Sequence, residues 1–481
     1  MKVLIMGLGL HGGGYESAVY FLKRGACLTV TDLRDEQTLA PTIERLEAAC
    51  KEFSCSSPIR YVLGRHELED FKNADIVIKN PGVNPDSIYL QAAKKIETDI
   101  SIFLAASPAQ LYAVTGTKGK STASSALYWI LSKIRKSGIA RLGGNITISP
   151  LSFLDELTED DDVVLELSSF QLGDLRGRLA PDGSPLLKPK AAVITTILRD
   201  HLDRYGTMER YVNDKRVIYQ GQDSGGITVV KDDDWGDSFR RESPARPLIH
   251  AGSPLEKGVS GGWVLDKGPG VARLYSGEKG FRGLCRGGET VELVPAKLLT
   301  PGDHQKRNLL TAALAVYGFG ADADDICKAL ATFAGVEHRL EFFHETENIR
   351  FYNDSAATIP EAAAAAIDAL DDGVRNLVLV TGGTDKNLDF SLLAKAAKKA
   401  SAVILLAGTG SEKLAACLRD AGITYNGPFD DIDQAVSSAL NAADAGSNVI
   451  LSPGCASFGM FKNEFDRGHK WKEAVRRLAC K

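Results

Sequence analysis

The sequence lacks the cysteine spacing of a zinc site and of a secreted disulfide framework. Its eight cysteines are scattered along 481 residues without a paired CxxC unit, which favours the cytoplasm as the compartment. Strong charge of one sign is also missing, because the net charge is only −5 at pH 7 and the isoelectric point is near 6. Without a broad basic surface, we expect no nucleic-acid binding, and small anionic ligands in local basic pockets fit the composition better.

Long apolar segments are missing as well. No run reaches the roughly 20 residues that cross a bilayer, so we expect no membrane partner. The amino-terminal stretch MKVLIMGLGLHGGG breaks into glycines after a short apolar run. It therefore predicts a first β-strand and not a signal peptide.

The chain is long enough for about three domains, because one hydrophobic core rarely serves more than about 250–300 residues. Strand-like and helix-like segments alternate throughout, which predicts an α/β protein with parallel sheets. We place a Rossmann-like domain at 1–109, a central P-loop ATPase-type α/β domain at 110–334 and a second Rossmann-like domain at 335–481. Within the central domain, short runs predict a small appended antiparallel sheet with strands at Gly226 to Lys231, Gly262 to Leu265 and Thr290 to Leu293.

The most informative segment follows an apolar strand at Tyr112 to Val114. A glycine turn leads from this strand into Lys-Ser-Thr at the start of a helix, which is typical of a phosphate-binding loop. Backbone N–H groups of such a turn can surround a polyphosphate, the lysine can contact the β and γ oxygens, and a hydroxyl can hold Mg²⁺. The loop is shorter than the usual nucleotide-binding pattern. The predicted ATP-binding residues are Gly116, Thr117, Lys118, Gly119, Lys120, Ser121 and Thr122.

A second glycine pattern, Gly7-x-Gly9-x-x-Gly12, follows the first predicted strand, and Asp32 ends the second strand twenty residues later. This is the outline of a dinucleotide-binding fingerprint. Taken alone, it supports a nicotinamide oxidoreductase. The same turn suits any nucleotide diphosphate, however, and glycines also occur at such turns for packing reasons.

Two candidate metal ligands follow apolar strands of the central domain. Glu166 ends the run Val163-Val164-Leu165, and His201 lies in the segment Arg199 to Tyr205. Ligands bind at the carboxyl edge of a parallel sheet, so both side chains could hold a metal beside the phosphate loop. An isolated acid there would more often be a solvated strand end, and a single histidine would more often be structural.

Several short motifs occur in one order along nearly the whole chain. They are TGTKGKST, ELSSFQL, DHLDRY and YVNDKRVIY in the central part, followed by GDHQ, EHRLE, NDS, GGTDK and SPGCAS. In kind, order and spacing they resemble the Mur ligase family of peptidoglycan synthesis. The short GLGL start and the FKN and RG motifs near the C-terminus are most similar to the members that add D-glutamate.

The resemblance implies a cytoplasmic, monomeric, ATP-dependent ligase that joins UDP-N-acetylmuramoyl-L-alanine to D-glutamate through an acyl phosphate. It implies two Mg²⁺ ions and a carbamate on Lys215, with Lys120, Glu166, His201 and Lys215 as catalytic residues. The metal ligands would be Ser121, Thr122, Glu166, His201 and the carbamylated Lys215. Residue by residue, the resemblance adds Gln305, Asn308, Arg339 and Asp354 to the ATP site. It assigns the UDP-sugar to Leu10, His11, Asp32, Arg34, Asn80, Gly82 and Asn145. It assigns D-glutamate to Thr358, Lys386 and Ser457.

Three positions depart from the family pattern: Ala356 replaces a lysine, Gln305 an asparagine, and Glu464 an aromatic residue. Loss of the lysine removes a cation near the phosphates or carboxylates. Two alternatives stay open, namely a Mur-type ligase for another amino acid and a regulatory nucleotide-binding protein on the same fold. Retention of Lys120, Glu166, His201 and Lys215 counts against the second.

Overall fold

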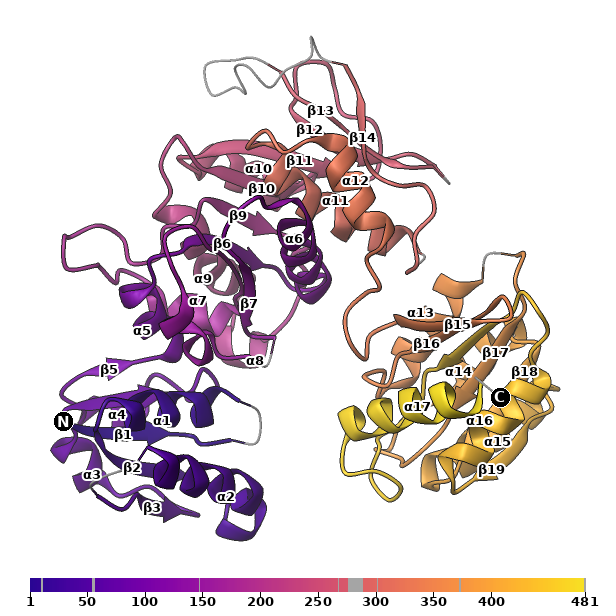
Figure 1. Cartoon of the computed structure of the whole chain (residues 1–481), viewed down its shortest axis with the longest axis horizontal. Coiled ribbons are helices and arrows are strands. Elements are labelled where there is room, and N and C mark those ends of the chain that lie inside the picture. Colours follow the sequence, from indigo (N-terminus) through magenta and orange to yellow (C-terminus); the bar gives the residue numbers. More distant parts are fainter. Residues whose placement is uncertain are drawn as a thin grey trace. The chain divides into compact units, whose positions relative to one another are not determined.

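The computed structural model describes residues 1–9, 12–53, 57–146, 148–266, 268–275, 289–300, 302–371 and 373–479. It is an α/β protein with three β-sheets (Figure 1). The chain forms two compact units: Met1–Val294 with Arg307–Ala329, and Pro295–Lys306 with Leu330–Lys481. The first two sheets lie in the first unit and the third sheet lies in the second. Within the described ranges, every helix is too short or too polar to span a lipid bilayer.

The first sheet has five parallel strands in the order β3-β2-β1-β4-β5. Side chains of β1 alternate between its faces, as the two-residue period of a strand requires. Val3 and Ile5 pack with helices α1 and α2, whereas Leu4 and Met6 pack with α3 and α4. The elements are β1 (Lys2–Met6), α1 (Gly13–Lys23), β2 (Cys27–Asp32), α2 (Glu36–Glu52), β3 (Arg60–Leu63), α3 (Leu68–Asn73), β4 (Ile76–Lys79), α4 (Ile88–Gln91), β5 (Ile96–Glu97) and α5 (Asp99–Ala106).

The central sheet has nine strands in the order β14-β13-β12-β11-β10-β9-β6-β8-β7. Its strands are β6 (Gln110–Thr115), β7 (Ala140–Gly144), β8 (Asp162–Glu166), β9 (Ala191–Ile194), β10 (Ile227–Lys231), β11 (Arg246–Ala251), β12 (Gly261–Val264), β13 (Gly270–Arg273) and β14 (Val291–Val294). Its helices are α6 (Lys120–Ile134), α7 (Ser169–Leu175), α8 (Leu202–Tyr205), α9 (Met208–Gln220), α10 (Asp234–Glu242), α11 (Asp303–Tyr317) and α12 (Ala323–Ala331).

Two of the expected antiparallel strands are present as β12 and β14, and each pairs with β13, a strand that the prediction lacked; the three extend one edge of the central sheet. The segment Gly226 to Lys231 differs from the expectation, because β10 pairs in parallel with both β9 and β11. Its first four residues are all buried, which is typical of a strand covered on both faces. A short apolar run does not reveal whether its neighbouring strands are parallel or antiparallel, so the prediction that this segment belongs to the antiparallel sheet was wrong.

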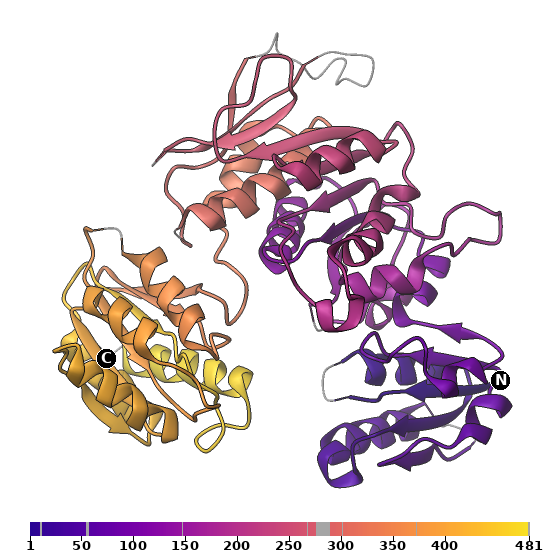
Figure 2. The same cartoon turned by 180° about the vertical axis from the view of Figure 1, so that it is seen from behind.

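The third sheet has six strands in the order β15-β16-β20-β17-β18-β19, with only the β15–β16 pair antiparallel. Leu377 and Leu379 of β17 pack with α13, α14 and α15, whereas Val378 and Val380 pack with α16 and α17, so helices cover both faces (Figures 1 and 2). The elements are β15 (Glu341–Thr346), β16 (Ile349–Asn353), α13 (Pro360–Leu370), β17 (Leu377–Thr381), α14 (Ser391–Ala396), β18 (Ala402–Leu406), α15 (Thr409–Asp420), β19 (Asn426–Phe429), α16 (Ile432–Ala442), β20 (Asn448–Leu451) and α17 (Glu464–Leu478).

Trp471 of α17 gives a test of this third core. It is fully buried, and its indole Nε1 donates a hydrogen bond to the Tyr352 carbonyl oxygen at 3.1 Å. We expect Trp471→Ala to lower the free energy of unfolding of this unit by about 3–5 kcal/mol, as measured by urea denaturation. Val374→Ala is the control, because Val374 is 87% exposed. Equal stability of the two variants would contradict the packing described here.

Candidate active site

The loop between β6 and α6 can be built only with glycine at two positions. Gly116 and Gly119 have φ angles of 145° and 88°, which L side chains rarely adopt. A Cβ atom at Gly116 would overlap the Thr195 hydroxyl, and one at Gly119 would overlap the Asn308 side-chain oxygen. The structure therefore brings Asn308, a predicted ATP contact, against the predicted phosphate loop.

Thr117 anchors this loop to its surroundings. Its hydroxyl lies 2.9 Å from the Tyr211 hydroxyl and accepts a hydrogen bond from the Leu198 N–H at 3.0 Å. The side chain is buried. Thr117 thus fixes the loop to α9 and to the segment after β9, while its neighbour Lys118 is exposed and Ser121 and Thr122 are half-buried in the first turn of α6.

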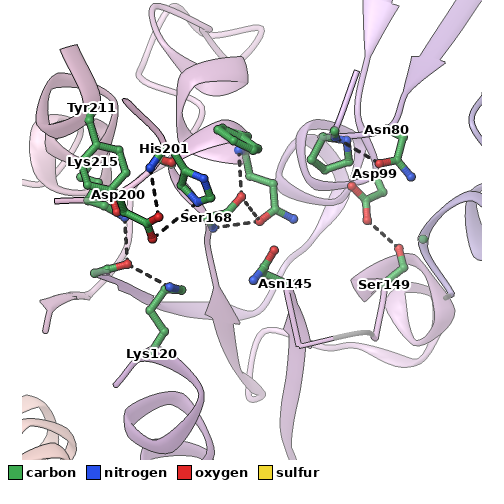
Figure 3. Close-up of a pocket in the computed structure, with 18 residues that line it drawn as sticks. Asn80, Asp99, Lys120, Asn145, Ser149, Ser168, Asp200, His201, Tyr211 and Lys215 are labelled. Atoms are coloured by element: carbon green, nitrogen blue, oxygen red, sulfur yellow. Dashed lines mark hydrogen bonds and ion pairs between the residues drawn. The ribbon is translucent and has the colours of Figure 1, made fainter. Parts of the chain in front are cut away.

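Two lysines share one acceptor inside the loop. Lys120 Nζ and Lys215 Nζ each donate to the Gly116 carbonyl oxygen at 2.9 Å (Figure 3). Lys215 also lies 3.4 Å from the Thr115 hydroxyl, and its side chain is 1% exposed. Burial, and secondly the charge of Lys120, lower the pKa of Lys215 to about 7. A substantial fraction of this amine is therefore neutral near pH 7.

Glu166 ends β8 with its carboxylate buried, at 1% exposure. One oxygen accepts a hydrogen bond from Asn145 Nδ2 at 3.0 Å, and the other from Ser124 Oγ at 3.4 Å. Both donors are neutral, so neither of them balances the carboxylate charge. Because β7 and β8 are parallel neighbours, Asn145 and Glu166 meet at the same edge of the sheet.

His201 is the N-cap residue of the short helix α8 and has a φ of 51°. Its Nε2 lies 3.7 Å from a carboxylate oxygen of Asp200, and its ring centre lies 5.0 Å from that of Phe170. The side chain is 46% exposed. His201 is therefore accessible from the cavity described next and has an acidic neighbour.

Lys120, Lys215, His201 and Asn145 line a cavity of about 410 Å³ within the first unit, whereas Glu166, Ser121 and Thr122 are not part of its lining. Figure 3 shows Asn80, Asp99 and Ser149 on one side of it, Lys120, His201 and Lys215 on the other, and Asn145 and Ser168 between them. Of the predicted residues, its lining includes Asn80, Gly82, Gly116, Lys120, Asn145, His201 and Lys215. Sequence reasoning missed the other polar side chains of the lining, which are Asp99, Ser149, Ser168, Ser169, Gln171, Asp200 and Tyr211.

Asp99 illustrates why some of them were missed. Its carboxylate accepts hydrogen bonds from Ser149 Oγ at 3.0 Å and from its neighbour's amide, Ile100 N–H, at 2.9 Å, and burial raises its pKa. In the sequence, Asp99 directly follows Thr98, the N-cap of α5. An acid in the first turn of a helix is common for local electrostatic reasons, so this position carries no signal of a site.

A second cavity, of about 530 Å³, lies at the carboxyl edge of the first sheet. Its lining includes Asp32, Arg34, Asn80 and Gly82 from the prediction, together with His66 and Tyr89, which the prediction lacked. The Asp32 carboxylate accepts a hydrogen bond from Gly9 N–H at 3.1 Å and so fixes the glycine turn. Leu10 and His11 lie outside the described residues. Asn80 and Gly82 line both cavities.

In the second unit, Asp354 supports the turn that carries Arg339. The buried Asp354 carboxylate accepts hydrogen bonds from Leu340 N–H at 3.0 Å and from Ser452 Oγ at 2.6 Å, and desolvation raises its pKa to about 7. His338 and Leu340 both have positive φ angles, and Arg339 between them is exposed. The two hydrogen bonds of Asp354 therefore hold the turn that carries Arg339 in place.

The three residues predicted to bind D-glutamate follow strands that are neighbours in the third sheet. Thr358 comes after β16, Lys386 after β17 and Ser457 after β20. Backbone hydrogen bonds join these loops, from Gly454 N–H to Ala357 O at 2.9 Å and between Thr384 and Ala456 at 3.0 Å. Lys386 is exposed and Ser457 is buried. Gln305 also belongs to this unit and is buried.

Three family models match consecutive parts of the chain. They are the Mur ligase MurD-like N-terminal domain at 1–102, the Mur ligase middle domain at 114–316 and the Mur ligase glutamate ligase domain at 338–455.

Individual proteins agree with these matches. The UDP-N-acetylmuramoylalanine–D-glutamate ligase of Treponema pallidum is 38% identical over 540 residues, which cover 98% of this chain and 97% of that protein. The ligase of the same name from Roseiflexus is 40% identical over 488 residues and 98% of each chain. The crystal structure of the UDP-N-acetylmuramate–alanine ligase MurC from Thermotoga maritima is alike in fold, with a TM-score of 0.57 at 18% identity over 100% of both chains. The chain belongs to the Mur ligase family, and its amino-terminal domain is of the MurD-like type.

Proposed function

We propose that this chain catalyses the ATP-dependent addition of D-glutamate to UDP-N-acetylmuramoyl-L-alanine, a cytoplasmic step of peptidoglycan precursor synthesis. The observation that carries the proposal is one cavity lined by the phosphate loop, by the buried amine of Lys215 and by Asn80 and Asn145 on the expected sugar side. The near full-length similarity to D-glutamate ligases supports the same reaction.

The chemistry has two steps. The carboxylate of the L-alanine unit attacks the γ-phosphorus of ATP, a C–O–P linkage forms and ADP leaves. The D-glutamate amine then attacks the carbonyl carbon, inorganic phosphate leaves, and the nitrogen loses a proton. In the first step one anion must approach another, so the site has to place positive charge around both. The ammonium of Lys120, at the phosphate loop, supplies part of that charge.

Residues that line the cavity or lie beside it would suit two Mg²⁺ ions. Glu166 with the hydroxyl of Ser121 or Thr122 would hold one ion, since its buried carboxylate is bonded to neutral donors. His201 and a carbamylated Lys215 would hold the other. When bound, the ions would neutralise charge on the phosphate oxygens and on the attacking carboxylate.

Lys215 has the environment that a carbamate requires. Its neutral amine attacks the carbon of CO₂, a C–N bond forms as one C–O π bond breaks, and the nitrogen releases one proton, so the neutral amine becomes an anionic carbamate. This reaction needs the unprotonated amine, and the lowered pKa of about 7 supplies it. An ammonium at this position would repel a metal ion, whereas the carbamate would bind it.

In the second unit, the D-glutamate site would use Lys386 for the side-chain carboxylate, with hydroxyls from Thr358 and Ser457. A fixed ammonium and two hydroxyl donors suit a dicarboxylic amino acid. The family resemblance assigns ATP contacts to Arg339 and Asn308, and the position of the Asn308 side chain against Gly119 of the phosphate loop supports the second assignment.

The amino-acid specificity can be measured directly. We expect ADP release from ATP in the presence of UDP-N-acetylmuramoyl-L-alanine and D-glutamate, but not with L-glutamate, L-alanine, L-lysine or meso-diaminopimelate. A coupled assay for ADP over this panel measures the preference. Faster turnover with any other amino acid would refute the proposed specificity, and no turnover with any of them would refute the reaction.

The role of Lys215 can be tested by chemical rescue. We expect Lys215→Ala to lower turnover by about 100-fold or more, because the metal would lose a ligand, and we expect added acetate or propionate to restore part of it. Lys190→Ala is the matched control, because Lys190 is a half-buried central-domain lysine that bonds Gln110 and lies outside the cavity. Full activity of Lys215→Ala without added acid would show that no carbamate is needed.

A further inference from the structure

The loop after β4 separates the two cavities of the first unit. Asn80 and Gly82 line both of them, the larger on the first-sheet side and the smaller on the central-sheet side. A nucleotide sugar with its base in one cavity and its reacting carboxylate in the other would have to pass this loop. The position of the loop relative to the central domain would therefore set how well such a substrate fits.

Lys79, the last residue of β4, holds this loop from inside the protein. Its side chain is 3% exposed, and its ammonium lies 3.4 Å from the carbonyl oxygens of both Asn80 and Val83. The third partner is a carboxylate oxygen of Asp174, at 2.8 Å. One ammonium thus connects the beginning and the end of the loop to a residue that comes from the central domain.

Asp174 belongs to α7, the helix that forms the opposite wall of the smaller cavity, on the central-sheet side. Ser168 caps α7 by accepting a hydrogen bond from Gln171 N–H at 3.2 Å, and both side chains line the cavity. Asp174 follows Gln171 by less than one turn and is itself nearly buried, with 10% exposure. The Lys79–Asp174 pair therefore joins the two walls across which a substrate would lie.

Stability alone does not explain such a pair. Taking two charges out of water is unfavourable, and a buried pair often contributes no more to stability than apolar side chains of similar size. What an ion pair adds is a defined distance and direction between the elements that carry it.

We propose that Lys79 and Asp174 are positioning residues that set the spacing between the Asn80–Val83 loop and α7 for binding the nucleotide sugar. This inference rests on the proposed function for the identity of the substrate. The Lys79 ammonium bonds Asp174 and the Asn80–Val83 loop and not the phosphate loop, so we expect its effect to fall on the nucleotide sugar and not on ATP.

A neutral double variant tests the inference without leaving a buried ion unpaired. In Lys79→Met with Asp174→Asn, we expect the KM for UDP-N-acetylmuramoyl-L-alanine to rise about tenfold, with the KM for ATP and kcat changed by less than about twofold. We expect Lys79→Arg alone, which keeps the positive charge, to raise the nucleotide-sugar KM less than the double variant does. An unchanged nucleotide-sugar KM in the double variant, or equal rises in both KM values, would overturn the proposal.

A matched control comes from a second ion pair between the same two domains. Arg24 and Asp155 lie 2.6 Å apart, and neither lines the two cavities. We expect Arg24→Ala with Asp155→Ala to leave both KM values unchanged. A rise like that of the Lys79 and Asp174 variant would mean that any contact between these domains has the same effect, and would contradict a specific role.

Amide hydrogen exchange separates this inference from the proposed reaction. Val83 N–H donates to Asn80 O at 3.0 Å, so its exchange rate reports the order of the loop without any substrate. We expect faster exchange at Val83 in the Lys79 and Asp174 double variant and unchanged exchange in the Arg24 and Asp155 control. If the wild-type protein shows no turnover, the proposed reaction fails, while unchanged exchange at Val83 would refute the positioning role.

Discussion

The burial of Lys215 against the phosphate loop is the constraint on which the site depends. Lys215 and Lys120 donate to the same carbonyl oxygen, and burial disfavours the charged form of Lys215. In the unfolded chain, the amine would stay protonated up to its ordinary pKa of 10.5. Without the carbamate, folding would therefore release a proton between about pH 7 and 10.5, and this group would make the protein more stable as pH rises through that window. The same desolvation that costs stability at low pH produces the neutral amine that can react with CO₂.

The sheets explain how the other groups reach Lys215. Parallel strands end at one edge, and β6, β7 and β8 deliver the phosphate loop, Asn145 and Glu166 to it. The hydrogen bond between Asn145 and Glu166 joins a predicted sugar contact to a predicted metal ligand. With the roles proposed above, a change at either residue would affect both substrate position and metal binding, and the two effects would be non-additive.

Local patterns predicted the parts of the site that depend on neighbours in sequence. The glycines of the phosphate loop and the acid at the end of β8 follow from turn geometry and from the edge rule for parallel sheets. Lys215 was identified only through family resemblance, because its helix is polar and would be interpreted as a surface helix. Contacts between distant segments were not predictable: Lys79 and Asp174 are 95 residues apart, and each looks like an ordinary charged residue in its own segment. The direction of β10 was missed for a related reason, since pairing partners are not encoded in one short run.

The most direct test of this account is the pKa of the Lys215 amine in the unmodified protein. It can be measured by NMR titration in CO₂-free buffer, with isotope-labelled lysine and with Lys215→Arg to assign the signal. The account predicts a pKa of about 7. A value near the ordinary 10.5 would contradict it, because the amine would then be protonated at neutral pH and unable to form a carbamate.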